Sequence, residues 1–316
     1  MAFAGIDTVV FGAPDLKSAR KMFTDWGLTK LRDGSAGLEF ETAIGSRVVV
    51  RKEDALRLPP RLSGGSNFRE IIWGVTSRKD LDAIAHNLAR DRSIMADADG
   101  TLHAVDDCGI NVGFRVWTHK TEKPGAGTFF NAPGRRARVD TVATAYAHAR
   151  PYRIGHAAFF VPDVKAGEKF YRRLGFWLSD RYAGGAAVFL RSAARADHHN
   201  LFMLKSRAGV TDLHHIAYEV RDVHEVFGGG IHYSKAGGIT AVGPGRHPIS
   251  SAYFWYFRNP LGGMMEYFCD PDFVTPKWRP TNYRVNRFSE WHLVDGIRQV
   301  DDGHVRPSLA TAKTGH

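Results

Sequence analysis

The segment RIGHAAFFVPDVKAGEKFYRRLGFWLSD, residues 153–180, has a counterpart near the start of the chain, GIDTVVFGAPDLKSARKMFTDWGLTKLRD at residues 5–33. Each copy reads as an apolar strand, a Pro-Asp-aliphatic step, an amphipathic helix and a Gly-containing turn before another strand. The Asp of each step can cap the helix that follows it. A second pair of similar segments lies at 213–227 and 69–88. The repeat therefore predicts four strand–helix–strands modules, two in each half of the chain.

The modules divide the chain into segments of different character. We expect an N-terminal domain at residues 1–118 and a C-terminal domain at residues 153–275. A connector rich in Gly, Pro, Arg and Ala covers 119–152, with a short helix around 139–149. Residues 276–316 are expected to form a tail. A chain of 316 residues is long enough for about two domains of ~150 residues each.

Composition excludes several classes of protein. The chain is 43% hydrophobic and 24% charged, as expected of an ordinary globular protein. It has no 18-residue apolar run, so no membrane span is expected. Its net charge of +10 comes from scattered Lys and Arg without a nucleic-acid-binding motif, so we expect no nucleic-acid partner. Only two cysteines, Cys108 and Cys269, are present, which indicates a reducing cytoplasm and no disulfide framework.

The register of the repeat selects two histidines. His156 precedes Asp163 by seven residues, and His215 precedes Asp222 by seven, so both occupy equivalent places in their strands. His214 does not fit this register, because neighbouring residues of a strand point to opposite faces. We therefore expect His214 to be structural or exposed.

The N-terminal half offers no such histidines. Counting back seven residues from its Asp-aliphatic steps gives Thr8 and Trp73, and a gapped alignment gives Glu70 in place of Trp73. We interpret the first half as a repeat without metal ligands.

Two histidines from separate modules suggest a metal site, since imidazole suits Fe, Mn, Zn and Ni. Glu266 is the candidate third ligand. It lies in the apolar stretch GMMEYF, where burying a lone carboxylate is costly. Arg258 could pair with it instead. Two histidines and one carboxylate with open coordination positions form the facial triad of non-haem Fe(II) oxygen chemistry.

Five segments together carry a family resemblance: GHAAFFVPD, DHHNLFML, LHHIAYEVRD, GPGRHP and YFWYFRNPLGGMMEYF. In this order they resemble the two-domain extradiol catechol dioxygenases of the vicinal oxygen chelate superfamily. The resemblance covers residues 5–275 and is most specific in the C-terminal half. It implies an α+β fold of four βαβββ modules, paired into two domains with curved, barrel-like mixed sheets.

The resemblance also implies roles for individual residues. His156, His215 and Glu266 match the family's metal ligands, which hold Fe(II), and Mn(II) accepts the same ligand set. Three further residues match groups around the bound oxygens: His199 as the acid/base histidine, with His198 as the alternative one residue away, and His247 and Tyr256. The implied reaction inserts both atoms of O2 into a catechol-type diol, cleaving the ring beside its hydroxyl groups.

Substrate contacts are predicted from strand alternation and from the tail. Ala158 and Ala217 should share a face with His156 and His215, leaving room for a ring substituent. After His247, where relatives often carry Asn and Asp, this chain has HPISS. Ser250 is the candidate contact there, and it offers no carboxylate. In the tail, Phe273 and Trp278 are candidates to close the pocket.

Two other kinds of function compete with ring cleavage. One is another metalloenzyme chemistry of the superfamily, such as a glyoxalase-like isomerase or transferase, whose sites usually have four protein ligands. The other is a non-catalytic protein that binds aromatic ligands. The resemblance favours the dioxygenase, with a small catechol and O2 as its partners, and suggests a homo-oligomer.

Overall fold

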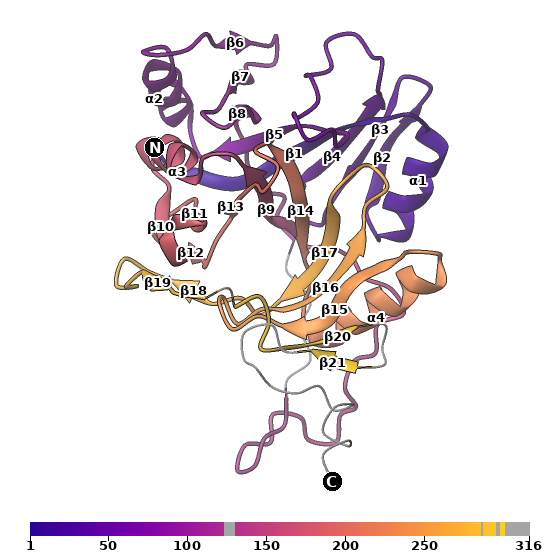
Figure 1. The fold of residues 1–316 in the computed structure, drawn as a ribbon. Helices are drawn as coiled ribbons and strands as arrows, with labels where there is room; N and C mark the ends of the chain where they lie inside the picture. Colours follow the sequence, from indigo (N-terminus) through magenta and orange to yellow (C-terminus); the bar gives the residue numbers. More distant parts are fainter. Residues whose placement is uncertain (123–129, 286, 295–297, 301–316) are drawn as a thin grey trace.

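A computed structural model describes residues 1–122, 130–285, 287–294 and 298–300. Its strands and helices follow the predicted order strand–helix–three strands four times over (Figure 1). Among the described residues, no helix is long and apolar enough to cross a bilayer. Both cysteines are free and buried.

The N-terminal half holds two modules. The first contains β1 (Phe3–Ala13), α1 (Leu16–Asp25), β2 (Thr29–Gly34), β3 (Gly37–Glu41) and β4 (Arg47–Lys52). The second contains β5 (Phe68–Val75), α2 (Arg78–Leu88), β6 (Met95–Ala96), β7 (Leu102–Val105) and β8 (Asn111–Val116). They join in one sheet of order β2-β3-β4-β1-β5-β8-β7-β6. The sheet is mixed, because β1 pairs parallel with β4 and antiparallel with β5.

The C-terminal half repeats this plan. Its first module contains β9 (Arg153–Val161), α3 (Val164–Arg173), β10 (Trp177–Tyr182), the 3-10 turn η1 (Ala183–Gly185), β11 (Ala187–Arg191) and β13 (Leu201–Lys205). The short strand β12 (Ala196–Asp197), between β11 and β13, belongs to a separate two-stranded sheet. Its second contains β14 (Asp212–Glu219), α4 (Val223–Lys235), β15 (Thr240–Arg246), β16 (Tyr253–Arg258) and β17 (Met264–Cys269). The central strands run in the order β13-β9-β14-β17-β16-β15, which matches the N-terminal sheet module by module. The expected α+β fold of four βαβββ modules is confirmed.

Local sequence explains where the helices begin. Asp15 and Asp163 accept backbone N–H bonds at the starts of α1 and α3, and Asp222 does the same for α4. Helix α2 differs, because its cap is Ser77 and not an Asp. The Ser77 hydroxyl accepts the Asp80 backbone N–H at 3.2 Å and donates to the Asp80 carboxylate at 2.6 Å.

The segment after the connector corrects one prediction. Residues 139–149, all of them described, form no helix. The chain instead passes close against α4, where a Cβ on Gly228 would lie 2.1 Å from the Tyr146 carbonyl oxygen and one on Gly229 would lie 2.5 Å from the Ala149 Cβ. This close backbone contact with a glycine run replaces the helix that composition suggested.

The tail contributes strands to the C-terminal half. Its short strands are β19 (Thr281–Tyr283), β20 (Trp291–Val294) and β21 (Arg298–Val300), and β18 (Phe273–Val274), just before the tail, pairs with β12. β19 pairs with β10 and β20 pairs with β15, so the tail extends both edges of the C-terminal sheet. The remaining tail residues, 286, 295–297 and 301–316, lie outside the described part of the chain.

Candidate metal centre

Three adjacent strands of the C-terminal sheet carry the predicted metal ligands. His156 lies on β9, His215 on β14 and Glu266 on β17. Ala217 of β14 stands in register with His156 on one side and with Glu266 on the other. Residues in register on adjacent strands share a face, so the three form a row with the smallest side chain in the middle. Ala217 thereby leaves room for the ligand atoms to meet above it.

The ligand atoms converge on one point. The Nε2 atoms of His156 and His215 lie 3.0 Å apart, and a Glu266 carboxylate oxygen lies 3.0 Å from the first and 3.3 Å from the second. Within the described residues, these three form the one cluster of His, Cys, Asp and Glu with ligand spacing, all within 4.8 Å. Arg258 is exposed and is not among the groups in ion-pair distance of Glu266.

The donor set fits a divalent cation. The Glu266 side chain is 1% exposed, and the imidazoles of His156 and His215 lie 3.0 and 3.3 Å from one of its oxygens. A buried carboxylate is costly unless it is paired with a positive charge. Burial raises the pKa of Glu266, but the charges and hydrogen bonds of His156, His247 and His215 together outweigh it and lower the pKa below its usual value. A metal ion is the partner that two imidazoles and one carboxylate suit together.

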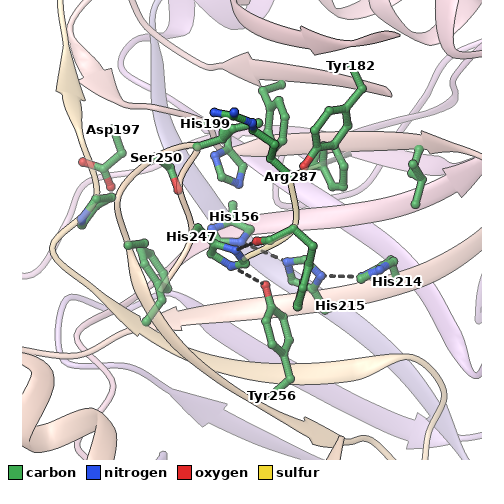
Figure 2. Close-up of a pocket in the computed structure, with 18 residues that line it drawn as sticks. His156, Tyr182, Asp197, His199, His214, His215, His247, Ser250, Tyr256 and Arg287 are labelled. Atoms are coloured by element: carbon green, nitrogen blue, oxygen red, sulfur yellow. Dashed lines mark hydrogen bonds between the residues drawn. The ribbon is translucent and has the colours of Figure 1, made fainter. Parts of the chain in front are cut away.

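Two further polar side chains, Tyr256 and His247, lie beside these candidate ligands. The Tyr256 hydroxyl and His247 Nε2 are 3.1 Å apart, and His247 Nδ1 lies 2.5 Å from the Phe288 carbonyl oxygen (Figure 2). Since a carbonyl only accepts, His247 Nδ1 carries a hydrogen, and the Nε2 of a neutral ring accepts from Tyr256. Burial, followed by the negative charge of Glu266, raises the pKa of Tyr256 well above its usual value. Tyr256 therefore stays a hydrogen-bond donor.

His199 lies next to the ligands. Its ring centre is 4.3 Å from that of His156, and it lines the same pocket. Burial, reinforced by the neighbouring positive charge of His156, holds the pKa of His199 well below its usual value. His198, the alternative, is fully buried and faces Asp180 at 2.8 Å, outside the pocket lining. The geometry thus favours His199 over His198 as the residue that meets a ligand.

His214 was predicted to be structural or exposed, and the structure shows it half-buried, which rules out the exposed alternative. It lines the pocket, and its Nδ1 lies 2.6 Å from His215 Nδ1. The pairing of β14 with β9 shifts register between Leu213 and His215, so strict alternation fails at this point. Burial lowers the pKa of His214 to about 4.

These side chains surround a cavity of about 170 Å³. Aromatic and aliphatic side chains make up most of the wall: Tyr182, Phe189, Phe202, Leu204, Ile249, Ala252, Phe268, Pro271 and Phe288. Asp197 and Arg287 are the charged side chains of the rim that sequence reasoning missed. Burial raises the pKa of Asp197, although the Arg153 guanidinium beside it acts in the opposite direction.

The predicted substrate contacts have different outcomes. Ser250 lines the cavity. Ala158 and Ala217 are fully buried and are not among the lining residues, because Phe202 and His215 flank Ala158 and because Ala217 packs beneath Phe268.

The tail does reach the cavity, but not through the residues we expected. Phe273 is 60% exposed, and the Trp278 indole donates to the Ser179 carbonyl oxygen at 3.0 Å, so neither lines the pocket. Phe288 lines it instead, held against His247. Nothing in the sequence around Phe288 singled it out.

The N-terminal half contains the same framework without the ligands. Because Ser77 caps α2, the residue seven positions earlier is Glu70, so the gapped alignment was correct and Trp73 was wrong. In the paired strands, Gly113 takes the place of Glu266, since it stands opposite Ile72 as Glu266 stands opposite Ala217. Glu70 accepts a bond from His103 at 2.7 Å. Thr8, Glu70 and Gly113 do not form a metal triad.

Comparisons with known proteins agree with this geometry. A family model described as the Glyoxalase/Bleomycin resistance protein/Dioxygenase superfamily matches residues 153–268. Metapyrocatechase 2 of Cupriavidus necator is 31% identical over 274 residues, covering 86% of this chain and 83% of the relative. The chain belongs to the extradiol dioxygenase family. The expected superfamily and enzyme class are thereby confirmed: the protein is an extradiol ring-cleaving dioxygenase, an oxidoreductase.

Solved structures share the fold of this dioxygenase. A Mn(II)-bound glyoxalase from Novosphingobium aromaticivorans superposes with a TM-score of 0.73 at 20% identity, covering 98% of this chain and 96% of the other. BphC, a halotolerant catechol dioxygenase, superposes with a TM-score of 0.68 at 19% identity, covering 97% and 96%. At these identities, the likeness establishes the fold alone.

Proposed function

We propose that this dioxygenase cleaves a catechol-type diol with O2 at a single Fe(II), or Mn(II), held by His156, His215 and Glu266. The observation that carries the proposal is the convergence of these ligand atoms within 4.8 Å at a pocket with aromatic walls. A metal bound there would supply open coordination positions for the diol oxygens and for O2, and its charge would favour loss of a hydroxyl proton.

We assign the proton transfers to His199. Its ring lies beside His156 and faces the cavity, so it can take a proton from a hydroxyl group placed near the ligands. A histidine that accepts this proton can return it later in the same turnover, when negative charge develops on oxygen. His199 would therefore serve first as a base and then as an acid.

His247 and Tyr256 stand on another part of the pocket wall. Tyr256 is a protonated phenol in a buried setting, and a fixed donor of this kind stabilises negative charge without reorganising. His247 is oriented by the Phe288 carbonyl, so the tail helps to fix the ring that holds the Tyr256 hydroxyl in place. We assign the pair to the oxygen atoms of the substrate and of O2.

Cavity size indicates a small aromatic substrate. An apolar cavity of ~150 Å³ takes up benzene, so about 170 Å³ accommodates one aromatic ring. Ser250 and Arg287 line the cavity and offer polar groups to a ring substituent. We propose catechol or a substituted catechol as the substrate.

The experiment is anaerobic loading with Fe(II), and separately with Mn(II), followed by oxygen uptake with catechol, 3-methylcatechol and 2,3-dihydroxybiphenyl. We expect one metal ion per chain and a yellow ring-opened product formed with matched oxygen consumption. Catechol binding without oxygen uptake in either loaded form would instead support a binding protein. Failure to retain either metal would refute the ligand set.

A glyoxalase-like reaction is less well supported. Such sites usually have four protein ligands, and the metal cluster within the described residues has three. Location in a reducing cytoplasm and assembly into a homo-oligomer also remain part of the proposal. Size-exclusion chromatography with light scattering tests the assembly.

A further inference from the structure

We propose that Asp180 and His198 are positioning residues that fix the tautomer of His199, so that His199 turns an unprotonated Nε2 toward the pocket. The inference rests on the role proposed above for His199 and extends it to two residues that do not touch the pocket. It follows from a chain of hydrogen bonds that runs from a buried carboxylate to the pocket wall.

This series of hydrogen bonds begins at Asp180 on β10. One of its carboxylate oxygens accepts the Thr281 backbone N–H at 2.6 Å, and the other lies 2.8 Å from His198 Nε2. The side chains of His198 and Asp180 are 0% and 1% exposed. The His198 backbone N–H also donates to the Asp272 carbonyl oxygen at 2.7 Å. His198 is therefore held at its backbone and at its ring.

The direction of each bond follows from the chemistry of the groups. An ionised carboxylate only accepts, so His198 Nε2 donates to Asp180. A neutral imidazole has one N–H, so His198 Nδ1 is left as an acceptor. The atom facing it is His199 Nδ1 at 3.2 Å, which must then donate. His199 Nε2 remains as the unprotonated nitrogen.

This arrangement matters because only an unprotonated Nε2 can take a proton from a substrate hydroxyl. In water, the neutral histidine side chain prefers to carry its hydrogen on Nε2, which is the wrong tautomer for this task. A buried Asp that holds a catalytic histidine in its productive tautomer is worth about 10⁴ in kcat in the serine proteases. Here the same effect would pass through one additional histidine.

The first test is a measurement on the unaltered protein. The full-length chain is labelled with ¹⁵N-histidine, and long-range ¹H–¹⁵N spectra are recorded for the metal-free form and for a form loaded with diamagnetic Zn(II). A His199→Gln variant assigns the signals by difference. We expect His199 to carry its hydrogen on Nδ1. A hydrogen on Nε2, or averaging between the two tautomers, would overturn the proposal.

The second test reverses the direction of these hydrogen bonds with a nearly isosteric substitution. In Asp180→Asn, the Thr281 N–H still requires an acceptor, so the amide oxygen stays there and the amide NH2 faces His198 Nε2. His198 must then protonate Nδ1 and donate to His199, which would present an N–H to the pocket. We expect the NMR tautomer of His199 to switch, and kcat to fall about 10²–10⁴-fold with KM and metal content changed little.

Glu70→Gln is the matched control. It alters another buried carboxylate–histidine pair, Glu70 with His103, in the N-terminal half. The His199 signals and kcat should stay as in the unaltered protein. If Asp180→Asn folds and keeps the original tautomer, the proposal is wrong; if it does not fold, the measurement on the unaltered chain decides alone.

The outcomes separate this inference from the proposed function. A Nδ1-protonated His199 in a chain that consumes no O2 with any catechol would contradict the function and support the tautomer assignment. Oxygen uptake with a Nε2-protonated His199 would contradict the assignment and support the function.

Discussion

The Nε2 atoms of His156 and His215 lie 3.0 Å apart, although 59 residues separate them in the chain. A hydrogen bond between the two Nε2 atoms needs one donor and one acceptor, so the accepting lone pair then lies beside the Glu266 carboxylate, which also only accepts. Glu266 completes the cluster from a third strand. The arrangement is readily explained by a shared cation, and the first prediction tests that explanation.

Glu266→Gln should abolish metal retention. Replacing a group that merely orients a metal ligand lowers affinity by roughly 10–100-fold, so removing the charged ligand itself should cost more than about 100-fold. Metal analysis after dialysis, and titration with Fe(II), measure the loss. Glu70→Gln, at the place in the N-terminal half that corresponds to His215, changes a buried carboxylate far from this cluster and should retain one metal ion per chain. A Glu266→Gln protein with unchanged metal content would eliminate this carboxylate as a ligand.

Tyr256→Phe should retain the metal and lower kcat. The change removes the hydroxyl that lies 3.1 Å from His247 and leaves the ring in place. We expect kcat to fall on the order of 10²–10³-fold, the effect of removing one donor to a developing negative charge. Tyr218→Phe is the control, since the buried Tyr218 hydroxyl has no hydrogen-bond partner within the described residues. Equal kinetics for the two variants would argue against a role for Tyr256.

Phe288→Ala should change substrate preference. The centre of its ring lies 5.2 Å from that of His247 and 5.4 Å from that of Phe254, and the ring forms part of the cavity wall. Removing it enlarges the cavity, so we expect kcat/KM for catechol to fall about 10-fold or more, and that for 2,3-dihydroxybiphenyl to fall less. Steady-state oxygen uptake with both substrates measures the ratio. A uniform decrease would indicate that Phe288 acts only by orienting His247.

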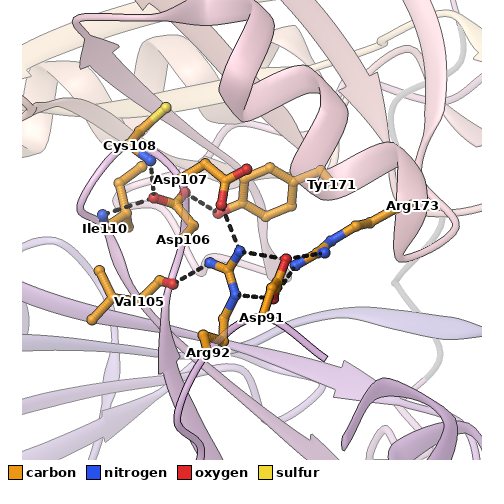
Figure 3. A network of polar contacts seen from close by, with 9 residues as sticks. All are labelled: Asp91, Arg92, Val105, Asp106, Asp107, Cys108, Ile110, Tyr171 and Arg173. Carbon is orange, nitrogen blue, oxygen red and sulfur yellow. Dashed lines mark hydrogen bonds and ion pairs between the residues drawn. The ribbon is translucent and has the colours of Figure 1, made fainter. Parts of the chain in front are cut away.

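Asp106→Asn should change how stability depends on pH. Asp106 lies where the two halves of the chain meet: it accepts from the Tyr171 hydroxyl of α3 at 3.0 Å and from the backbone N–H groups of Cys108 and Ile110 (Figure 3). Burial raises the pKa of Asp106 from 3.8 to about 6. The folded state then binds the proton more tightly than the unfolded state, so this group lowers the free energy of unfolding as the pH rises from about 4 to 6.

The expected size is about 3 kcal/mol, since one pKa unit corresponds to 1.36 kcal/mol. Urea unfolding of both proteins across this pH range measures it. The difference in unfolding free energy, Asp106→Asn minus unaltered protein, should increase with pH. A difference that is constant with pH would show that Asp106 contributes nothing to the pH dependence of the unfolding free energy.

Local sequence was sufficient for the module plan and for selecting the three candidate metal ligands that the structure brings together. In each module the first strand leads directly into a helix cap. The residue seven positions before the cap therefore takes the same place in each strand, because only the short stretch of backbone between the two residues determines that place. His156 and His215 were found in this way, and Glu266 was found because its apolar neighbours predict burial. The same count gives Glu70 once Ser77 is identified as the cap, which only the structure revealed.

Tertiary structure decided what surrounds those ligands. His214 enters the pocket because the register of β14 shifts beside it, and such a shift depends on how the strand fits its partner. Ala158 and Ala217 lie on the face of the sheet that strand alternation predicts. They do not reach the cavity, because Phe202 lies beside Ala158 and Phe268 packs against Ala217. Phe288 and the Asp180–His198 pair come from segments that only tertiary contacts bring together, Phe288 with His247 and Asp180 with His198. Spacing along the chain fixes which face a side chain takes, whereas the neighbours it meets there depend on contacts between distant segments.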